Sequence, residues 1–278
     1  MFQKLNIHAQ NETSQHGEDG ILQYLISLLG DKCIPSCCEF GAWDGIAMSN
    51  TYRLWAKQGW SAILIEGDAK KYPLLLENTR AFPKVRAFRQ MLEARGAGCL
   101  DTLFAREGLE SEIGLLSIDI DSIDYYIFKY LERVHPQIVV VEFNQGIPPH
   151  IDYVDPEGQV YLRCSAKALE RLGREKGFRL ACCTKTNAIF LREDLAAACH
   201  IPELPVEYLF DYSELAPAQI RINHANSKYP IWTSRQRGGL KFLNKAYYFL
   251  SAKLNRKQSW IKPPAEVREA MRRAGLDF

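Results

Sequence analysis

The apolar positions between residues 18 and 192 follow two alternating patterns. Ile and Leu recur at helical spacing over residues 18–30, and a short, nearly continuous apolar segment follows at residues 36–40. This alternation of a helix-like segment and a strand-like segment repeats along the chain. It is typical of parallel strands that are buried on both faces and connected by helices. Strands are predicted at 36–40, 60–66, 84–89, 114–120, 137–143, 178–184 and 187–192. Helices are predicted at 18–30, 49–59, 69–80, 100–107, 123–134 and 165–177.

The last two predicted strands are separated only by Lys185 and Thr186. Strands with no helix between them pair antiparallel. A mostly parallel seven-stranded sheet that ends in an antiparallel hairpin is the layout of the Rossmann-like class I methyltransferase fold, whereas the plain dinucleotide-binding fold continues with β-α-β units. We therefore expect this α/β fold for residues 1–199. Pro residues interrupt the pattern after residue 199, so residues 200–278 are expected to form a basic extension that contacts the acceptor, a partner or a membrane.

The stretch CCEFGAWDG, residues 37–45, places a glycine turn at the carboxyl end of the first predicted strand. Ligands of open α/β sheets bind at that edge, and Gly41 and Gly45 let a ligand approach the backbone closely. Glu39 and Asp44 would repel a diphosphate, which prefers bare N–H groups. S-adenosylmethionine (SAM) carries a sulfonium and an ammonium instead of phosphates, so the two acids favour this cofactor over NAD.

The second predicted strand ends at Glu66. A carboxylate at this place accepts hydrogen bonds from the ribose hydroxyls of an adenosine ligand. NAD and SAM would both use it, so only the acidic turn and the terminal hairpin separate the two cofactors. The alternative is a solvated acid at a strand end with no ligand.

Several motifs occur in a fixed order along residues 14–192, namely SQHGEDGIL, CCEFGAWDGIAMSNTYRLWAKQGW, AILIEGD, LLSIDIDSIDYYIF, IVVVEFN and TNAIFLR. In these motifs the chain resembles the FkbM-like methyltransferases, and most of all the bacterial branch that opens with SQxGEDG. The resemblance implies SAM-dependent O-methylation, often of sugars in glycans or natural products, with other acceptors in some relatives.

The resemblance also implies which residues hold the cofactor. Ser49 and Asn50 would cap the helix beside the methionine moiety, and Gln15, Glu18 and Asp19 would help to close the site. The implied cofactor-binding residues are Gln15, Glu39, Gly41, Ala42, Asp44, Gly45, Ser49, Asn50, Glu66, Gly67 and Asp119.

Methyl transfer to a hydroxyl also needs a group that takes its proton, or a metal that lowers its pKa. The fourth predicted strand ends with Asp119 and Asp121, and the fifth with Glu142 and Asn144. Neighbouring strands bring these ends together, so Asp121, Glu142 and Asn144 are candidate Mg²⁺ ligands. The alternative is that the acids hydrogen-bond loop N–H groups. Residues 122–124 read Ser-Ile-Asp where the family has Gly-Asn-Asp, so this loop must turn without the glycine.

Two histidines are candidate general bases. His16 lies within SQHGEDG, just before a predicted helix, and His150 lies in the loop that leaves the fifth strand. Either side chain could accept a proton near neutral pH, although a given His is more often a surface or structural group. Together with Asp119, Asp121 and Glu142, they complete the candidate catalytic residues.

The charge of the chain is unevenly distributed. Residues 217–278 contain 13 Lys and Arg but only 3 Asp and Glu, so residues 1–216 carry a net charge of −8, although the whole chain has a net charge of only +2. Residues 239–257 predict an amphipathic helix in which Lys and Arg flank an apolar stripe. This helix would pack on the protein's own core or on a second copy in a homodimer, or bind an anionic membrane or a partner enzyme of glycan assembly. Nucleic acid ranks lower as a partner, because a basic stripe alone does not specify it.

The chain opens without the apolar core of a signal peptide, has no apolar run of membrane-spanning length, and shows no CxxC spacing among its eight Cys residues. We expect a cytoplasmic protein, peripheral at the inner membrane face if the basic helix binds lipid. Together with the family resemblance, which implies the acceptor, the sequence predicts a SAM-dependent O-methyltransferase that acts on a sugar hydroxyl of a glycan, glycolipid or natural-product precursor. The alternatives are transfer to a peptide or another small molecule, a non-catalytic binding protein that retains the fold, and an NAD-linked redox enzyme.

Overall fold

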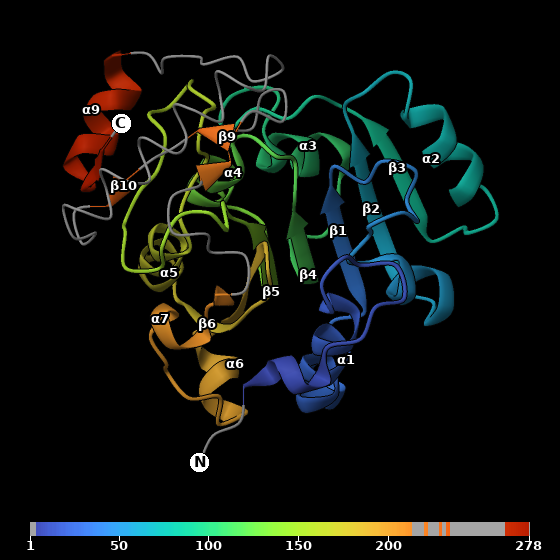
Figure 1. The fold of residues 1–278 in the computed structure, drawn as a ribbon. Coiled ribbons are helices and arrows are strands. Elements are labelled where there is room, and N and C mark those ends of the chain that lie inside the picture. The colour runs from blue at the N-terminus through green and yellow to red at the C-terminus, as the bar shows by residue number, and fades with distance from the viewer. Residues whose placement is uncertain (1–3, 213–219, 222–227, 230–231, 234–264, 278) are drawn as a thin grey trace.

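A seven-stranded sheet forms the centre of the computed structural model, which describes residues 4–212, 220–221, 228–229, 232–233 and 265–277 (Figure 1). Each strand begins and ends close to its predicted bounds, since the apolar segments that define the strands are the buried ones. The strands are β1 (Ser36–Phe40), β2 (Ser61–Glu66), β3 (Val85–Arg89), β4 (Glu112–Ile118), β5 (His135–Glu142), β6 (Phe178–Cys183) and β7 (Asn187–Arg192).

The order of strands across the sheet is β3-β2-β1-β4-β5-β7-β6. Neighbouring strands from β3 to β5 are parallel, and β7 is antiparallel to both β5 and β6. This arrangement is the class I methyltransferase fold and confirms the predicted fold class. The chain leaves β1 toward β2 on one side and reaches β4 on the other, so the carboxyl ends of β1 and β4 flank the point where ligands bind in such sheets.

Helices cover both faces of the sheet (Figure 1). One face packs against α1 (Glu18–Leu29), the π-helical turn η3 (Arg53–Lys57), α2 (Tyr72–Thr79) and α6 (Glu193–Ala198). The other face packs against α3 (Leu100–Glu107), α4 (Asp124–Tyr130), α5 (Ala166–Glu175) and α7 (Val206–Leu209). Two short 3-10 turns, η1 (Leu5–His8) and η2 (Gly30–Lys32), flank α1.

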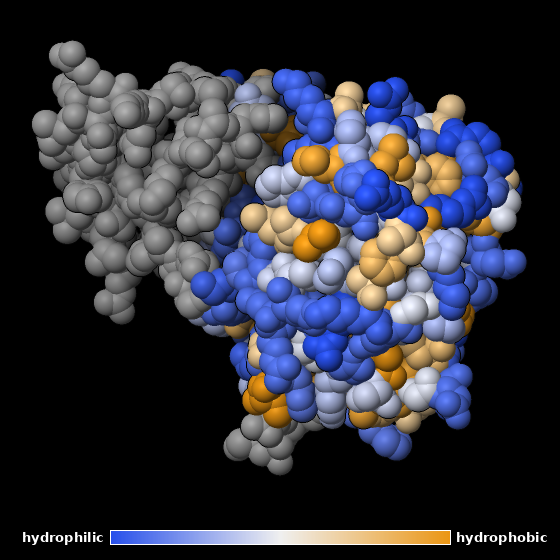
Figure 2. Space-filling view, turned by 90° about the vertical axis from the view of Figure 1, so that its right-hand side faces the viewer, coloured by the Kyte–Doolittle hydropathy of each residue, from blue (hydrophilic) through white to orange (hydrophobic). Residues whose placement is uncertain are grey.

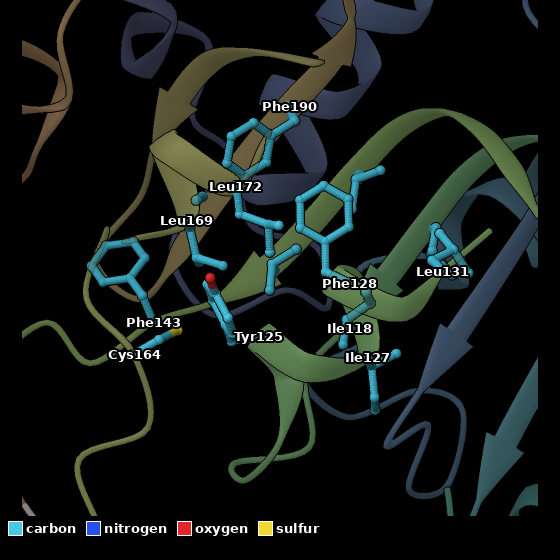
Figure 3. Packing of buried hydrophobic residues seen from close by; sticks show 14 of the residues in the cluster. Ile118, Tyr125, Ile127, Phe128, Leu131, Phe143, Cys164, Leu169, Leu172 and Phe190 are labelled. Atoms are coloured by element: carbon cyan, nitrogen blue, oxygen red, sulfur yellow. The ribbon is translucent and has the colours of Figure 1, made fainter. Parts of the chain in front are cut away.

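Alternate residues of each strand serve the two faces, because side chains of a strand point to opposite sides in turn. In β5, Ile138 belongs to the cluster under α1, whereas Val139 and Val141 belong to the cluster under α4 and α5. Figure 3 shows this second cluster, in which the rings of Phe128 from α4 and Phe190 from β7 have centroids 5.8 Å apart. The continuous apolar runs of the sequence are therefore explained by burial on both sides.

Two predicted helices are wrong in extent. The second predicted helix is reduced to η3, because residues 49–51 hydrogen-bond to Glu39 instead of continuing a helix. The fifth predicted helix ends at Tyr130, since the carboxylate of Asp101 accepts the N–H groups of residues 132–134. In both cases a carboxylate outside the predicted helix accepts its donors: Glu39 accepts two hydroxyls and one backbone N–H, and Asp101 accepts three backbone N–H groups.

The described parts of the predicted extension pack in two places, the main core and a separate small cluster. The segment after residue 199 places Val206 and Phe210 in the core beside α4 and α5. Met271 and Leu276 are buried in a third cluster, against the loop that follows β5. The elements here are β8 (Ile220–Arg221), β9 (Lys228–Tyr229), β10 (Trp232–Thr233), α9 (Ala265–Arg273) and β11 (Leu276–Asp277). The amphipathic helix predicted at 239–257 lies outside the described residues.

In the described part of the chain, no helix combines the length and the apolar character needed to cross a membrane. The face in Figure 2 is mostly hydrophilic, with apolar residues in small separate patches. Nine large hydrophobic side chains among the described residues are exposed, and three of them, Trp43, Met48 and Met91, line one cavity. This cavity lies at the edge of the sheet where the sequence places its candidate site.

Candidate active site

A cavity of about 360 Å³ opens at the carboxyl ends of β1, β2 and β4. Its lining is strongly acidic: among the described residues, five carboxylates and one ammonium face it. The charged lining residues are Glu39, Glu66, Asp68, Lys71, Asp119 and Asp121. The field inside such a cavity favours a cationic ligand over an anionic one.

Eight of the eleven predicted cofactor-binding residues line this cavity, and three do not. The eight are Gln15, Glu39, Gly41, Ala42, Ser49, Glu66, Gly67 and Asp119. Asp44 turns back to its own loop, where Oδ1 accepts the N–H groups of Ile46 and Ala47. Gly45 faces Leu75, and the buried Asn50 donates its side-chain amide to Ser117 Oγ. These three residues shape the loop beside the cavity.

Glu39 at the end of β1 is held by three donors. Its Oε2 accepts the hydroxyls of Ser49 and Thr51, each at 2.6 Å, and its Oε1 accepts the Asn50 N–H at 2.7 Å. Burial raises the pKa of Glu39, while these hydrogen bonds favour its ionised form. Glu39 therefore fixes the loop that carries Ser49 to the cavity wall, and it contributes negative charge there.

Gly41 is required by a close backbone approach. Its φ is +68°, and a Cβ atom at this position would lie 2.1 Å from the Asp119 carbonyl oxygen. Any side chain would push the ends of β1 and β4 apart, because the contact is with backbone. The glycine thus brings Asp119 next to the turn. This contact joins the two halves of the site, namely the ends of β1 and β2 and the ends of β4 and β5.

Glu66 at the end of β2 is 6% exposed and accepts two backbone N–H groups. Oε2 accepts from Trp43 at 2.9 Å, and Oε1 accepts from Asp68 at 2.6 Å. Each carboxylate oxygen has a second lone pair, so both oxygens can still accept a hydroxyl. The carboxylate is therefore fixed in orientation and able to bind a vicinal diol at the cavity.

The SQHGEDG motif has a mainly structural role. Asp19 Oδ2 accepts the N–H groups of residues 12–14, and Glu18 Oε1 accepts from Thr184 Oγ1 and Asn187 Nδ2 in the β6–β7 hairpin. These bonds anchor the segment before α1 over the edge of the sheet. Within the motif, Gln15 alone reaches the cavity, with Nε2 2.7 Å from Met48 Sδ.

A cluster of four acids and one arginine lies at the carboxyl ends of β4 and β5. The guanidinium of Arg163 is buried, with Nη1 3.0 Å from Asp121 Oδ1 and a hydrogen bond to Glu142 Oε2. Burial, with the charges of Asp124 and Asp121, raises the pKa of Asp119 to about 7. Burial and the charge of Asp119 also raise the pKa of Glu142 well above its ordinary value, although Arg163 opposes this.

The geometry gives the magnesium prediction no support. Arg163 lies between Asp121 and Glu142, where the prediction placed a metal ion. Asn144 braces the following loop, since its Oδ1 accepts the Gly146 N–H and its Nδ2 donates to the Leu162 carbonyl. Within the described ranges of the chain, no group of three or more His, Cys, Asp or Glu residues is arranged to hold a metal.

The loop that departs from the family pattern is closed by Asp124. Its Oδ1 accepts the Ile120 N–H and its Oδ2 accepts the Ser122 N–H, both at 2.8 Å. Asp121 takes the left-handed conformation, with φ +58°, one position before the expected glycine. The loop therefore turns without that glycine, because Asp tolerates this conformation better than most residues.

Neither predicted histidine base is among the residues that line the cavity. His16 is half-buried and donates its backbone N–H to Glu18 Oε2. His150 is also half-buried, in the loop that follows β5. Among the candidate catalytic residues, the cavity lining includes Asp119 and Asp121.

Comparison with known proteins finds similar solved structures at low sequence identity. No protein-family model and no curated protein matches the chain. Among solved structures, the CMeT domain of citrinin polyketide synthase is 8% identical, with a TM-score of 0.39 over 57% of this chain and 46% of that one. The N-terminal domain of EvdMO1 with SAH bound is 10% identical, with a TM-score of 0.42 over 66% and 82%. A SAM dependent methyltransferase from Aquifex aeolicus is 11% identical, with a TM-score of 0.38 over 61% and 87%.

The chain spans less than half the length of the first of these structures and most of the other two. At identities and scores this low, the likeness carries no argument about cofactor, acceptor or individual residues. Those have to be argued from the cavity itself.

Sequence reasoning missed Arg163 and the apolar rim of the cavity. Arg163 lies in no motif; the only signal was a charged residue within the otherwise apolar stretch VYLRCSA. Trp43 and Met48 both have left-handed backbones, with φ of +50° and +61°. Strained residues of this kind gather at functional sites, but a sequence does not reveal φ.

Proposed function

We propose that this protein is a SAM-dependent methyltransferase that transfers a methyl group to the hydroxyl of a sugar in a glycan, glycolipid or natural-product precursor. The observation that carries the proposal is the acidic cavity beside a glycine turn, at the carboxyl edge of a class I methyltransferase sheet. A sulfonium and an ammonium gain from nearby carboxylates, whereas a diphosphate is repelled. The acceptor class rests on the resemblance of residues 14–192 to FkbM-like methyltransferases.

The residues at the ends of β1 and β2 fit an adenosine ligand. SAM would supply a methyl group on a positively charged sulfur, which is already activated, so the protein's main task is positioning. Glu66 would accept the two ribose hydroxyls with the lone pairs that Trp43 and Asp68 leave open. Gly41 lets the ligand approach the backbone at the end of β1.

The acids at the end of β4 fit the removal of the proton from the acceptor hydroxyl. Asp119 lines the cavity next to Gly41, and its pKa of about 7 suits a group that takes a proton from a hydroxyl near neutral pH. The neighbouring carboxylates favour proton uptake by Asp119, because one more negative charge in this cluster is unfavourable. In this role Asp119 replaces the histidines as the base.

Cofactor binding is tested by calorimetry with SAM, S-adenosylhomocysteine (SAH) and NADH. We expect SAM and SAH to bind and NADH not to bind. Glu66→Ala should weaken both affinities at least about tenfold, because two hydrogen bonds to a charged group are lost. Glu77→Ala, which removes an exposed acid of α2, is the matched control and should bind normally. Binding of NADH alone would overturn the proposal in favour of redox chemistry, and no binding at all would favour a non-catalytic protein.

The acceptor is tested by mass spectrometry of glycans from cells with the unaltered protein and from cells with Asp119→Asn. We expect a glycan that gains the mass of one CH₂ group in the first cells and not in the second. A peptide or another small molecule that shows this difference, with no glycan affected, would contradict the choice of a sugar acceptor and retain the methyltransferase.

A further inference from the structure

Among the described residues, Arg163 is the basic residue whose ion pairs with the acidic cluster are seen, and it pairs with two of the four acids. It is 8% exposed, and its Nη1 contacts both Asp121 and Glu142. Asp119 and Asp124 lie close enough for their charges to interact with it. Because Asp119 and Asp121 line the cavity, the positive charge of Arg163 offsets part of the field that a ligand there experiences.

The loop after β5 holds Arg163 in place. Its backbone is left-handed, with φ +62°, and it bonds to Asp155 in both directions: Arg163 N–H donates to Asp155 Oδ2 at 2.6 Å, and Asp155 N–H donates to the Arg163 carbonyl at 2.8 Å. The same Oδ2 accepts the N–H groups of Tyr161 and Leu162, and Oδ1 accepts the Tyr153 hydroxyl. A residue this strained keeps its conformation only where its surroundings enforce it.

The segment formed by residues 265–277 packs against this loop. Met271 and Leu276 are each 1% exposed, in a cluster with Tyr153, Leu162 and two isoleucines of the loop. Leu162 precedes Arg163, and Tyr153 bonds to Asp155, so the cluster contacts both sides of the network that fixes Arg163. The segment therefore packs directly on the structure that carries the guanidinium into the site.

We propose that Arg163 is a positioning residue that sets the charge balance of the SAM site, and that residues 265–277 hold it there through the loop after β5. The inference rests on the proposed function, since it concerns the same cavity. It also assigns a role to the end of the predicted extension: residues 265–277 support the active site through an apolar contact. A change in this apolar contact is expected to shift the loop that carries Arg163, because close-packed interiors transmit strain to their neighbours.

SAM and SAH are suitable probes, because they differ at sulfur: SAM carries a positive charge and SAH none. Loss of the Arg163 charge should favour the cation, so in Arg163→Met the ratio of the SAH Kd to the SAM Kd should rise about threefold or more. Arg163→Lys keeps the charge and should leave the ratio within about twofold. Calorimetry at about pH 8.5, where ionised carboxylates are favoured, measures both constants without an acceptor.

Met271→Ala tests the role of the segment. We expect the same rise in the Kd ratio and faster hydrogen exchange in residues 153–164, because a cavity replaces a buried side chain. The matched control is Arg272→Ala. Arg272 lies on the same helix, and its side chain is 71% exposed. It should change neither the ratio nor the exchange.

The outcomes separate the two proposals. If neither probe binds to the unaltered protein, the proposed function fails and this inference fails with it. If both bind and the ratio is unchanged in Arg163→Met, the role of Arg163 alone is overturned. If that ratio rises while Met271→Ala behaves like Arg272→Ala, the role of residues 265–277 is overturned.

Discussion

The acids at the ends of β1 and β2 and the acids at the ends of β4 and β5, which form the two halves of the site, are held in different ways. At the ends of β1 and β2, each acid is satisfied by short hydrogen bonds from its own neighbourhood: Glu39 by residues 49–51, and Glu66 by Trp43 and Asp68. These donors keep the carboxylates oriented, and those of Glu39 oppose the rise in its pKa that burial causes.

At the ends of β4 and β5, four carboxylates lie together and share Arg163. Some of their donors are local, since Asp124 accepts two backbone N–H groups. Burial and the charges of the neighbouring acids raise the pKa values of Asp119 and Glu142, and the Arg163 guanidinium only partly opposes this rise.

The difference matches the two tasks of the proposed function. A binding surface for a cofactor needs acceptors in a fixed orientation, and local hydrogen bonds provide them. A group that takes up a proton needs a charge that is easily neutralised, and a crowded acidic cluster provides it. Three further experiments would break or sharpen this contrast.

Gly41→Ala should have the largest effect, because Gly41 joins the two halves. Its new Cβ would lie 2.1 Å from the Asp119 carbonyl oxygen, so the free energy of unfolding should fall by about 3 kcal/mol or more, and SAH binding should be lost. Chemical denaturation and calorimetry measure the two effects.

The matched control for this change is Gly59→Ala. Gly59 has a similar φ of +71°, but a Cβ there meets nothing within 4 Å, so only about 1 kcal/mol of backbone strain is expected. Equal losses in the two variants would show that strain, and not the approach of β1 to β4, explains the requirement for Gly41.

Asp119→Asn should change how stability depends on pH. The folded pKa is raised from 3.8 to about 7, so between these values the folded protein holds a proton that the unfolded chain releases. The free energy of unfolding therefore falls as the pH rises through this window, and the amide variant should lack this fall. Urea denaturation should show the variant more stable than the unaltered protein at about pH 8 and equal to it at about pH 4.

The exposed Asp31, outside the site, provides the control for this experiment. Asp31→Asn should keep the fall in stability of the unaltered protein over the same pH range. The same fall in Asp119→Asn would contradict the assignment of the raised pKa to Asp119, and would remove the contrast between the two halves of the cavity.

Asp121→Asn should have the smallest effect. The Asp121 side chain is 74% exposed, so solvent screens its ion pair with Arg163, and the free energy of unfolding should change by no more than about 0.5 kcal/mol. Excess chelator should likewise leave the SAH affinity of the unaltered protein unchanged. A large loss in the variant that the chelator reproduces would instead restore the magnesium prediction.

Much of the first half of the site could be predicted from sequence. Glu39, Gly41 and Glu66 stand at the ends of apolar segments. The donors of Glu39 are residues 49–51, and Glu66 accepts from Asp68 nearby and from Trp43 in the preceding strand–loop segment. The assignment of Asp44 to the cavity lining does not match the structure, because an Asp in a turn can bind its own backbone instead. A sequence does not distinguish these two orientations.

The second half could be predicted only in part. Asp119 and Glu142 were found because they end predicted strands. Arg163 was missed because it comes from a long loop after β5, where its backbone N–H is bonded to Asp155. The histidines were plausible bases by residue type, but type does not tell which side chain reaches the cavity.

The sequence by itself determined the order of helices and strands, the terminal hairpin and the acids at the strand ends, because periodicity and turn residues act over a few neighbouring positions. The tertiary structure alone decided which acids face the cavity, which are satisfied locally, and which share Arg163. Those outcomes depend on distances and burial between segments far apart in the chain, and electrostatic interactions are set by such distances.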